Sequence, residues 1–457
     1  MPSNLSALTA RSAALLLMLQ TAPFAQSLTP LPEQLFAPPV YQGATRSFDR
    51  LSTQPRRPVA AGTLILTDAL RRALSANPKL TAAERDIGIA AGKRLQASAI
   101  PNPEVSFELD NAFGTGDFRG TRSAETTLQL SQVVELGGKR EARIAAGSAD
   151  VESARWQRAA LRLEILSETA VAFFNVLSGQ RKGQIFDVQI ESLQRLTPLL
   201  QRRVEAGASS PAETARAQLA ADLVRAERER ARTALAIARR ELAVLMGGSV
   251  PDFSLVAGDL SRVFRPPAFE TVLRGLDNNP QLVRWIAVRA QRDAELLSAR
   301  LKAVPDVKME LAWRHHRESD DHAVRVGASI AVPVWDQNLG GIQEARESRA
   351  KVDAERASSR AALILTLGKA YETLSGASRE IEILRGAALP NARRLTEAIE
   401  SGYAQGRFTL LEVLDAQSSA AQAALREQEA LVSFHTSVAT LEGLTGMPLG
   451  QSREASK

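Results

Sequence analysis

Two stretches of the chain alternate between apolar and polar residues. In residues 103–134, Val105, Phe107 and Leu109 are separated by polar residues, and a second alternating run returns after a polar gap. Residues 305–334 repeat this arrangement. A period of two gives a strand one apolar and one polar face, as transmembrane strands need, although a half-buried hairpin of a soluble protein has the same pattern. The alternation therefore predicts a β-hairpin in each stretch.

The longest stretches without strand or turn signals are helical. In residues 138–207 the only internal proline is Pro198, and in residues 341–406 it is Pro390. A helix of roughly 70 residues would be about 100 Å long. Each stretch reverses at a glycine-containing turn and returns as a second helix. The glycines at the turns and at the ends of the returning helices are Gly207, Gly406, Gly247 and Gly446.

The same order of elements occurs twice. A helix of moderate length precedes each hairpin, at 67–98 and at 269–302, and Thr67 with Asp68 is suited to cap the first one. The sequence NPKL at 77–80 returns as NPQL 202 residues later, and PEVSFEL at 103 returns as PDVKMEL at the same offset. The chain is therefore predicted to contain two copies of one unit of roughly 200 residues.

The N-terminus predicts an exported protein. Arg11 precedes an apolar core at 12–19 that is too short to span a bilayer, as in a signal peptide, and no later run approaches the roughly 18 apolar residues of a spanning helix. The predicted parts, in order, are a signal peptide (1–25), a proline-rich extended linker (26–62), the first repeat (63–250), an inter-repeat linker (251–268), the second repeat (269–448) and a polar tail (449–457).

Composition excludes several classes of function. The net charge of +6 is spread over the chain and does not indicate nucleic acid. The chain has no cysteine, and we find no G-x-x-x-x-G-K-[ST] phosphate loop and no H-E-x-x-H pair. We therefore expect neither an enzyme nor a cofactor.

The predicted fold class is α+β, and the chain is expected to oligomerise. Two β-hairpins and two long helical hairpins cannot bury their apolar faces within one chain. Four strands are also too few to close a barrel.

Four motifs resemble those of the TolC-type outer-membrane efflux channels, and the similarity extends over about residues 64–448. These motifs are NPKL (77–80), PNPEVSFEL (101–109), ELGGKR (135–140) and YAQGRFTLLEVLDAQ (403–417). The longer sequence QVVELGGKREARI (132–144) is most similar to the heavy-metal branch of that family, the cobalt-zinc-cadmium efflux type.

The resemblance implies a homotrimer in the outer membrane with a large periplasmic portion. Each chain would give four strands to one twelve-stranded, all-antiparallel transmembrane β-barrel, continued by a long periplasmic α-helical barrel. Closure would pair every strand edge within the lipid. The implied role is that of a passive exit duct in a tripartite efflux pump.

The resemblance also implies partners. These are a periplasmic adaptor (a membrane fusion protein), an inner-membrane resistance-nodulation-division transporter and outer-membrane lipid. The expected cargo is heavy-metal cations; drug or solvent efflux and type I secretion are alternatives with the same fold. An alternative of another class is a soluble periplasmic coiled-coil scaffold or adaptor.

By the same resemblance, Glu412 and Asp415 correspond to acidic residues of a periplasmic gate. Their spacing of three places both carboxylates on one helix face, and three copies would form a ring that attracts cations and raises the pKa of its members. An ordinary solvated helix face is the alternative. The turns at Gly207, Gly406 and Arg407 are candidate adaptor contacts, although chain reversal alone would require the glycines.

The sequence HHRESDDH, residues 315–322, contains three of the four histidines in the chain. The barrel interpretation places it in an extracellular loop between the third and fourth strands. The corresponding loop of the first copy contains no histidine. We therefore expect no structural metal site; weak cation capture by His315, His316 and His322 is the alternative to a charged loop tip.

Overall fold

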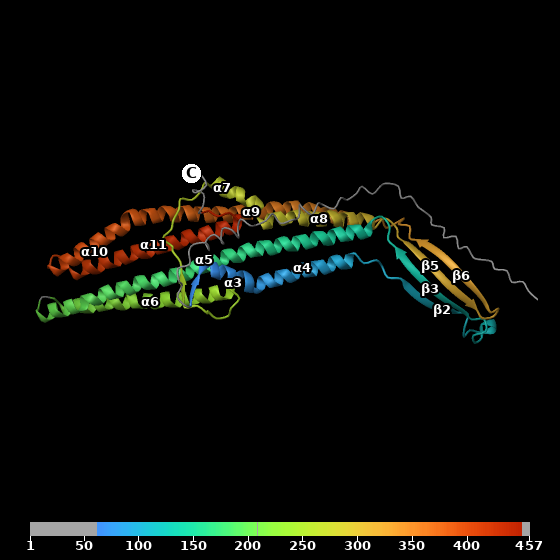
Figure 1. The fold of residues 1–457 in the computed structure, drawn as a ribbon, viewed down its shortest axis with the longest axis horizontal. Coiled ribbons are helices and arrows are strands. Elements are labelled where there is room, and N and C mark those ends of the chain that lie inside the picture. The colour runs from blue at the N-terminus through green and yellow to red at the C-terminus, as the bar shows by residue number, and fades with distance from the viewer. Residues whose placement is uncertain (1–61, 208, 450–457) are drawn as a thin grey trace, which may run out of the picture. The chain divides into compact units, whose positions relative to one another are not determined.

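The computed structural model describes residues 62–207 and 209–449 (Figure 1). The chain divides into two compact units, Met1–Pro39 and Val40–Lys457, and all described residues belong to the second unit. The predicted signal peptide, the linker 26–62 except for Gly62, and the polar tail except for Leu449 lie outside the described residues.

Asn-Pro pairs interrupt the helices that precede the strands, so the prediction of one continuous helix at 67–98 and at 269–302 is wrong. The first copy contains α3 (Leu66–Ala76) and α4 (Pro78–Ala97). The second contains α7 (Phe269–Gly275), a 3₁₀ turn η2 (Leu276–Asn278) and α8 (Pro280–Leu301). A residue before proline avoids the helical region, and Asn77 and Asn279 are accordingly extended, with ψ of 121° and 128°.

The predicted cap at Thr67 and Asp68 is also wrong. Both residues lie inside α3, whose N-cap position is Ile65, without a side-chain hydrogen bond. The helix begins directly after the short strand β1 (Thr63–Ile65), so the backbone enters it earlier than the cap signal indicates.

Asn77 and Asn279 connect the start of one helix with the end of another in the same copy. Each side chain accepts a hydrogen bond from the backbone N–H two residues later, at 2.9 and 2.7 Å. Each Nδ2 donates to a backbone carbonyl, that of Leu245 at 3.0 Å or that of Leu444 at 2.8 Å. These carbonyls belong to the last turns of α6 (Pro211–Leu245) and α11 (Leu410–Thr445), where a helix leaves its acceptors without intrahelical donors. We call these two arrangements the asparagine clamps.

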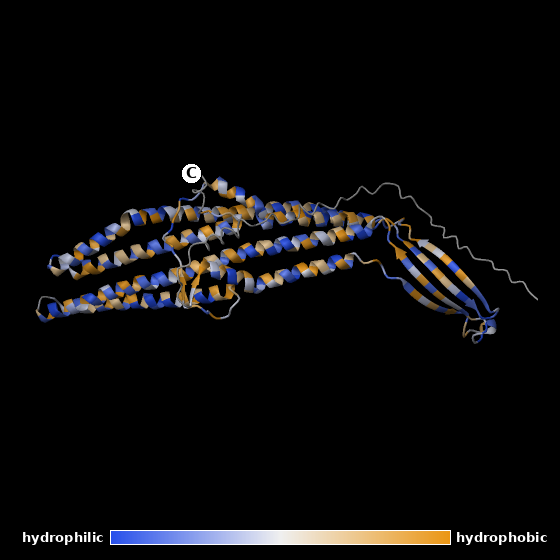
Figure 2. Cartoon of the chain, in the orientation of Figure 1, coloured by the Kyte–Doolittle hydropathy of each residue, from blue (hydrophilic) through white to orange (hydrophobic). Residues whose placement is uncertain are grey.

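Four strands form one antiparallel sheet in the order β2-β3-β5-β6. They are β2 (Glu104–Asp110), β3 (Glu125–Val134), β5 (Val307–His316) and β6 (Asp321–Ile330). All four lie within the two segments whose alternation predicts hairpins, and Figure 2 shows the hydropathy alternating along them. The hairpins join through β3 and β5, where Leu128 pairs with Trp313.

Long helices make up most of the remaining described chain. The 67-residue α5 (Lys139–Glu205) contains Pro198 and packs along α6, as Figure 1 shows. In the second copy, α9 (Leu339–Ile383) continues through a five-residue π-helical turn η3 (Leu384–Ala388) into α10 (Leu389–Ala404), which α11 follows. The π turn ends two residues before Pro390, which cannot donate a helical hydrogen bond. Among the described helices, none combines the length and apolar character that a membrane crossing requires.

The largest core cluster joins helices of both copies. Its most deeply buried members include Phe173, Val176, Leu242, Leu367, Leu374, Phe434 and Leu441. The inter-repeat segment, residues 251–268, packs on this core and contributes Phe253, Val256 and Leu260 to it. Its strand β4 (Leu255–Ala257) pairs in parallel with β1, and the Gln180 side chain both donates to and accepts from the backbone of Val256, each at 2.9 Å. The Tyr371 hydroxyl donates to the Pro267 carbonyl at 2.9 Å.

Candidate functional site

One face of the four-stranded sheet is apolar and exposed. All four strands contribute large apolar side chains to it: Val105, Phe107, Leu128, Leu130, Met309, Leu311, Trp313, Val324, Val326 and Ile330. Val326 is 76% exposed, so the described residues leave this face open. A contiguous exposed apolar surface of this kind is typical of a contact with lipid or with another protein.

The opposite face of the sheet is polar and charged. Arg314 on β5 donates to Thr127 Oγ1 and to a carboxylate oxygen of Glu125 on β3, both at 3.0 Å. At the end nearest the turns, one row of polar residues crosses all four strands: Asp110, Glu125, His316 and Asp321. The sheet therefore separates an apolar side from a side that suits water.

The outer edges of the sheet are open. Among the described residues, neither β2 nor β6 pairs with a further strand on its outer side. Unpaired backbone groups along an edge favour pairing with a strand of another chain. Within the described residues of one chain, the sheet edges thus lack hydrogen-bond partners and the apolar face lacks a covering surface.

The three candidate histidines do not form one cluster, and the predicted loop at 315–322 is wrong in extent. Cross-strand pairing continues to His315 and His316 on β5 and to His322 on β6, so that only residues 317–320 form the turn. His315 and His322 lie on the apolar face, whereas His316 lies on the polar face, with its Nδ1 3.5 Å from Glu125 Oε1. Throughout residues 62–207 and 209–449, no group of three or more His, Cys, Asp or Glu side chains could hold a metal ion.

The ELGGKR motif forms the junction between β3 and α5. Gly137 and Gly138 have φ of 73° and 82°, in the left-handed region that favours glycine. The guanidinium of Arg143 binds both carboxylate oxygens of Glu135, and this hydrogen bonding lowers the pKa of Glu135 despite the opposing effect of burial. The motif therefore fixes the direction in which the helix leaves the strand.

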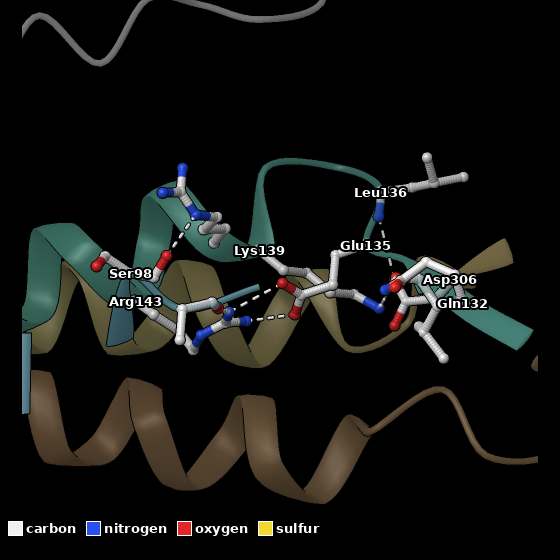
Figure 3. Close-up of polar contacts among 10 residues, drawn as sticks. Ser98, Gln132, Glu135, Leu136, Lys139, Arg143 and Asp306 are labelled. Carbon is white, nitrogen blue, oxygen red and sulfur yellow. Dashed lines mark hydrogen bonds and ion pairs between the residues drawn. The ribbon is translucent and has the colours of Figure 1, made fainter. Parts of the chain in front are cut away.

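Lys139 of this motif binds a residue of the second copy. Its Nζ lies 2.7 Å from Asp306 Oδ1, which also accepts the Leu136 N–H at 3.1 Å (Figure 3). Burial of Asp306 raises its pKa, but the Lys139 ammonium and the Leu136 N–H outweigh burial and hold the pKa below its usual value. Because Asp306 immediately precedes β5, this ion pair couples the two hairpins beside their helix junctions.

The turn between α10 and α11 contains the two candidate gate residues. Gly406 has φ of 73°, and the Arg407 N–H donates to the Gly402 carbonyl at 2.8 Å. Glu412 accepts the backbone N–H of Thr409 at 2.7 Å, and Thr409 Oγ1 accepts the Glu412 N–H at 3.4 Å, which completes a capping box at the start of α11. The Thr-x-x-Glu spacing is a sequence signal for this cap, and our sequence reasoning missed it.

Glu412 has two candidate roles, as part of the helix cap and as part of the predicted gate. In the single chain, the Thr409 N–H and hydroxyl lower the pKa of the Glu412 carboxyl. Asp415, one turn later, is exposed and makes no hydrogen bond or ion pair with the described residues. The structure thus gives Glu412 a local role at the helix terminus and leaves Asp415 without one.

The turn between α5 and α6 lies against the α10–α11 pair. Gly207 has φ of 69°, and a β-carbon at Gly207 or Gly406 would have no neighbour within 4 Å, so backbone conformation and not crowding requires glycine at these turns. The two pairs share a buried cluster of Leu200, Ala217, Tyr403, Leu410 and Val413. The guanidinium of Arg203 lies 4.9 Å from the ring centroid of Tyr403.

Comparisons with known proteins match almost the whole described chain. A family model described as "Outer membrane efflux protein" matches residues 69–248 and 274–447. The cobalt-zinc-cadmium resistance protein CzcC of Cupriavidus metallidurans is 30% identical over 387 residues, which cover 85% of this chain and 91% of that protein. The nickel-cobalt-cadmium resistance protein NccC of Alcaligenes xylosoxydans xylosoxydans is 24% identical over 297 residues, which cover 64% of this chain and 67% of that protein.

Solved structures share the fold. The crystal structure of the Campylobacter jejuni CmeC outer membrane channel superimposes with a TM-score of 0.71, at 16% sequence identity. The superposition covers 86% of this chain and 87% of that chain.

Proposed function

Because the chain belongs to the outer membrane efflux protein family, we propose that it is the exit duct of a tripartite pump that removes heavy-metal cations. Members of this family are transport components of the outer membrane and not enzymes. The observation that carries the choice of cargo is the 30% identity to the cobalt-zinc-cadmium resistance protein over 85% of the chain. NccC, whose name refers to nickel, cobalt and cadmium, supports the same choice.

The duct would be closed by three chains. Each sheet has four strands and two unpaired edges, so three sheets joined from β6 of one chain to β2 of the next would make a twelve-stranded barrel. A closed barrel is the β-structure that leaves no backbone group unsatisfied in lipid. Strands of ten residues, such as β3, β5 and β6, are long enough to cross the hydrocarbon layer when tilted. The apolar face would contact lipid and the polar face would line the lumen.

Two observations support an internal duplication. The family model matches the chain in two separate segments, and each segment contains one asparagine clamp between its Asn-Pro pair and the end of its last helix. We keep the proposed repeat boundaries at 63–250 and 269–448, with the packed segment 251–268 between them.

The remaining partners follow from the tripartite role. The long helices of the three chains would continue the barrel through the periplasm. The turns at Gly207, Gly406 and Arg407 would contact a periplasmic adaptor, which joins the duct to an inner-membrane resistance-nodulation-division transporter. The positive φ of both glycines supports their role in the turns themselves, and the exposed Arg407 is the residue whose side chain is available to a partner.

The proposed gate is a ring of acids from the α10–α11 turns. Glu412 and Asp415 are both exposed, three residues apart on α11, so three copies would bring six carboxylates together. Asp415 is the more informative residue, since Glu412 also caps the helix. Mutual repulsion in the ring would raise the carboxyl pKa values, opposing the effect of Thr409 on Glu412.

Single-channel conductance in planar bilayers tests the gate. We expect Asp415→Asn to raise the conductance, and Glu412→Gln to do so while keeping an oxygen that can accept the Thr409 N–H. Glu412→Ala alone is a poor test because it also removes the carboxylate that accepts the Thr409 N–H in the capping box. Glu380→Gln, which removes an exposed charge on α9, is the control. If Asp415→Asn and Glu412→Gln both conduct like the wild type and like the Glu380→Gln control, there is no acidic ring.

Cargo is tested in cells that contain the cognate adaptor and transporter. Deletion of the chain should increase the accumulation of zinc, cobalt or cadmium, and the intact chain should restore export. Increased sensitivity to drugs or solvents without a change in metal accumulation would instead favour the alternative cargo for this fold.

A further inference from the structure

An aromatic cluster ends the apolar face at the turn between β5 and β6. Trp313, His315 and His322 form what we call the ring stack. The ring centroids are 4.7 Å apart for the two histidines, 5.3 Å for Trp313 and His322, and 6.2 Å for Trp313 and His315. His315 lies directly opposite His322, and Trp313 is two residues earlier on β5, so strand alternation directs all three rings to one face.

The ring stack continues the apolar face without a break. The next pair along the same two strands on this face beyond Trp313 is Leu311 and Val326, which are 50% and 76% exposed. On the other side of the stack, the turn at 317–320 contains three charged residues, an arginine, a glutamate and an aspartate. The stack therefore occupies the boundary between an aliphatic surface and a charged turn.

The histidines bring unused polar atoms to this boundary. Within the described residues, neither ring nitrogen of the exposed His322 makes a hydrogen bond or an ion pair. His315 Nδ1 is buried and has no hydrogen-bond partner among these residues, and its Nε2 is 3.7 Å from Asp320 Oδ1, which is beyond hydrogen-bond distance. An imidazole ring has apolar faces and at least one N–H donor, which suits it to a surface that is apolar on one side and wet on the other.

We propose that the ring stack binds the phosphate-bearing headgroup of a membrane lipid. An acyl chain would lie on the apolar face beside Leu311 and Val326, and the lipid phosphate would accept a hydrogen bond from the imidazole of His322. This inference rests on the proposed contact of the apolar face with lipid. Aromatic rings are enriched where membrane proteins cross from hydrocarbon to water, and a phosphate is an acceptor that an imidazole N–H can serve.

The geometry favours a headgroup over a metal ion. The two imidazoles stack with their ring planes 27° apart, so their faces, and not their nitrogen lone pairs, are directed at each other. His316, the remaining nearby imidazole, is on the opposite face of the sheet. A zinc site would need three or four ligands that converge on one point.

The test measures lipid binding by the complete trimer. Purified, delipidated protein is titrated with phosphatidylglycerol in detergent, and the lipids retained are counted by native mass spectrometry. The double variant His315→Phe/His322→Phe keeps three rings in the stack but removes the N–H donors. We expect its apparent affinity for the lipid to be about tenfold weaker, which corresponds to about 1.4 kcal/mol.

His316→Phe is the matched control, since it makes the same change at the neighbouring residue on the polar face. We expect it to retain lipid like the wild type. The inference is overturned if the double variant binds lipid like the wild type, or if His316→Phe weakens binding equally. It is also overturned if excess inorganic phosphate displaces all retained lipid, or if Zn²⁺ binding is lost in the double variant while lipid affinity is unchanged.

These outcomes are separable from failure of the proposed function. Protein that neither forms trimers nor inserts into bilayers would refute the duct itself. A conducting trimer whose double variant retains lipid normally would refute only the lipid site.

Discussion

Removal of an asparagine clamp should destabilise the helical part of the protein. Asn279→Ala removes the acceptor for the Gln281 N–H and the donor to the Leu444 carbonyl. Loss of a capping side chain costs about 1 kcal/mol, and a buried carbonyl without a partner costs about 1–3 kcal/mol. Asn279 is 4% exposed, so water cannot easily replace either bond. We therefore expect a loss of about 2–4 kcal/mol, and the same for Asn77→Ala.

Urea unfolding followed by far-ultraviolet circular dichroism measures this loss, with all variants at one protein concentration because assembly contributes to stability. Asn391→Ala is the control: Asn391 is exposed on α10 and accepts one hydrogen bond from Arg394, so we expect less than about 0.5 kcal/mol. Asn279→Asp separates the two bonds, since a carboxylate keeps the cap but cannot donate to Leu444. The reasoning is refuted if Asn77→Ala and Asn279→Ala lose no more stability than Asn391→Ala.

Four further substitutions, one of them a control, test other contacts by the same unfolding measurement. Burial raises the pKa of Glu442 from 4.5 to about 7, so between these pH values the folded protein holds a proton that the unfolded chain releases. The resulting contribution to the free energy of unfolding is fully present below about pH 4.5 and is lost as the pH rises through about 7. Because Glu442 retains some exposure, Glu442→Gln should stabilise the protein by about 1–3 kcal/mol at pH 8 and have no effect at pH 4; equal effects at both pH values would contradict this. Asp306→Asn should lower the free energy of unfolding by about 1–3 kcal/mol at pH 7. This difference between wild type and variant should shrink as the pH falls below 3.8, because protonation of Asp306 breaks its ion pair with Lys139. A difference that does not change with pH would show that the charge of Asp306 is not its cause. Gly247→Ala should cost about 3 kcal/mol or more, because at φ of +83° the new β-carbon would lie 2.3 Å from the Ala76 carbonyl oxygen. Gly207→Ala is the control: its φ is also positive, but the β-carbon would lie in open space, so we expect a loss of about 1 kcal/mol. Equal losses of stability in the two variants would show that crowding at Gly247 is not the cause.

Local patterns were the part of the fold that the sequence revealed. The alternation around Phe107 and Leu311 marks strands because it depends only on neighbouring residues. The turns at Gly207 and Gly406 were visible for the same reason, since their positive φ is a property of one residue. The break at Asn77 was missed although its signal was present: a proline disfavours the helical conformation of the residue before it.

Contacts between distant residues were not accessible to this reasoning. The packing of the inter-repeat segment depends on Gln180, which lies more than 70 residues away from the backbone of Val256 that it binds. His315 and His316 are consecutive on β5 and therefore lie on opposite faces, but which of them shares a face with His322 depends on the register of β5 and β6. The capping box of Glu412, in contrast, is a local motif: Thr409 and Glu412 have the Thr-x-x-Glu spacing, so the sequence alone could have predicted it.

Cross-linking the sheet edges tests the central claim, that three chains close one barrel. The chain has no cysteine, so a single pair can be introduced without background, with one member on β2 (Ser106→Cys or Glu108→Cys) and one on β6 (Ala323→Cys or Arg325→Cys). Oxidation in the outer membrane should give covalent trimers for the pair in register. Only monomers for every pair, together with a folded, lipid-free single chain in buffer, would contradict the account.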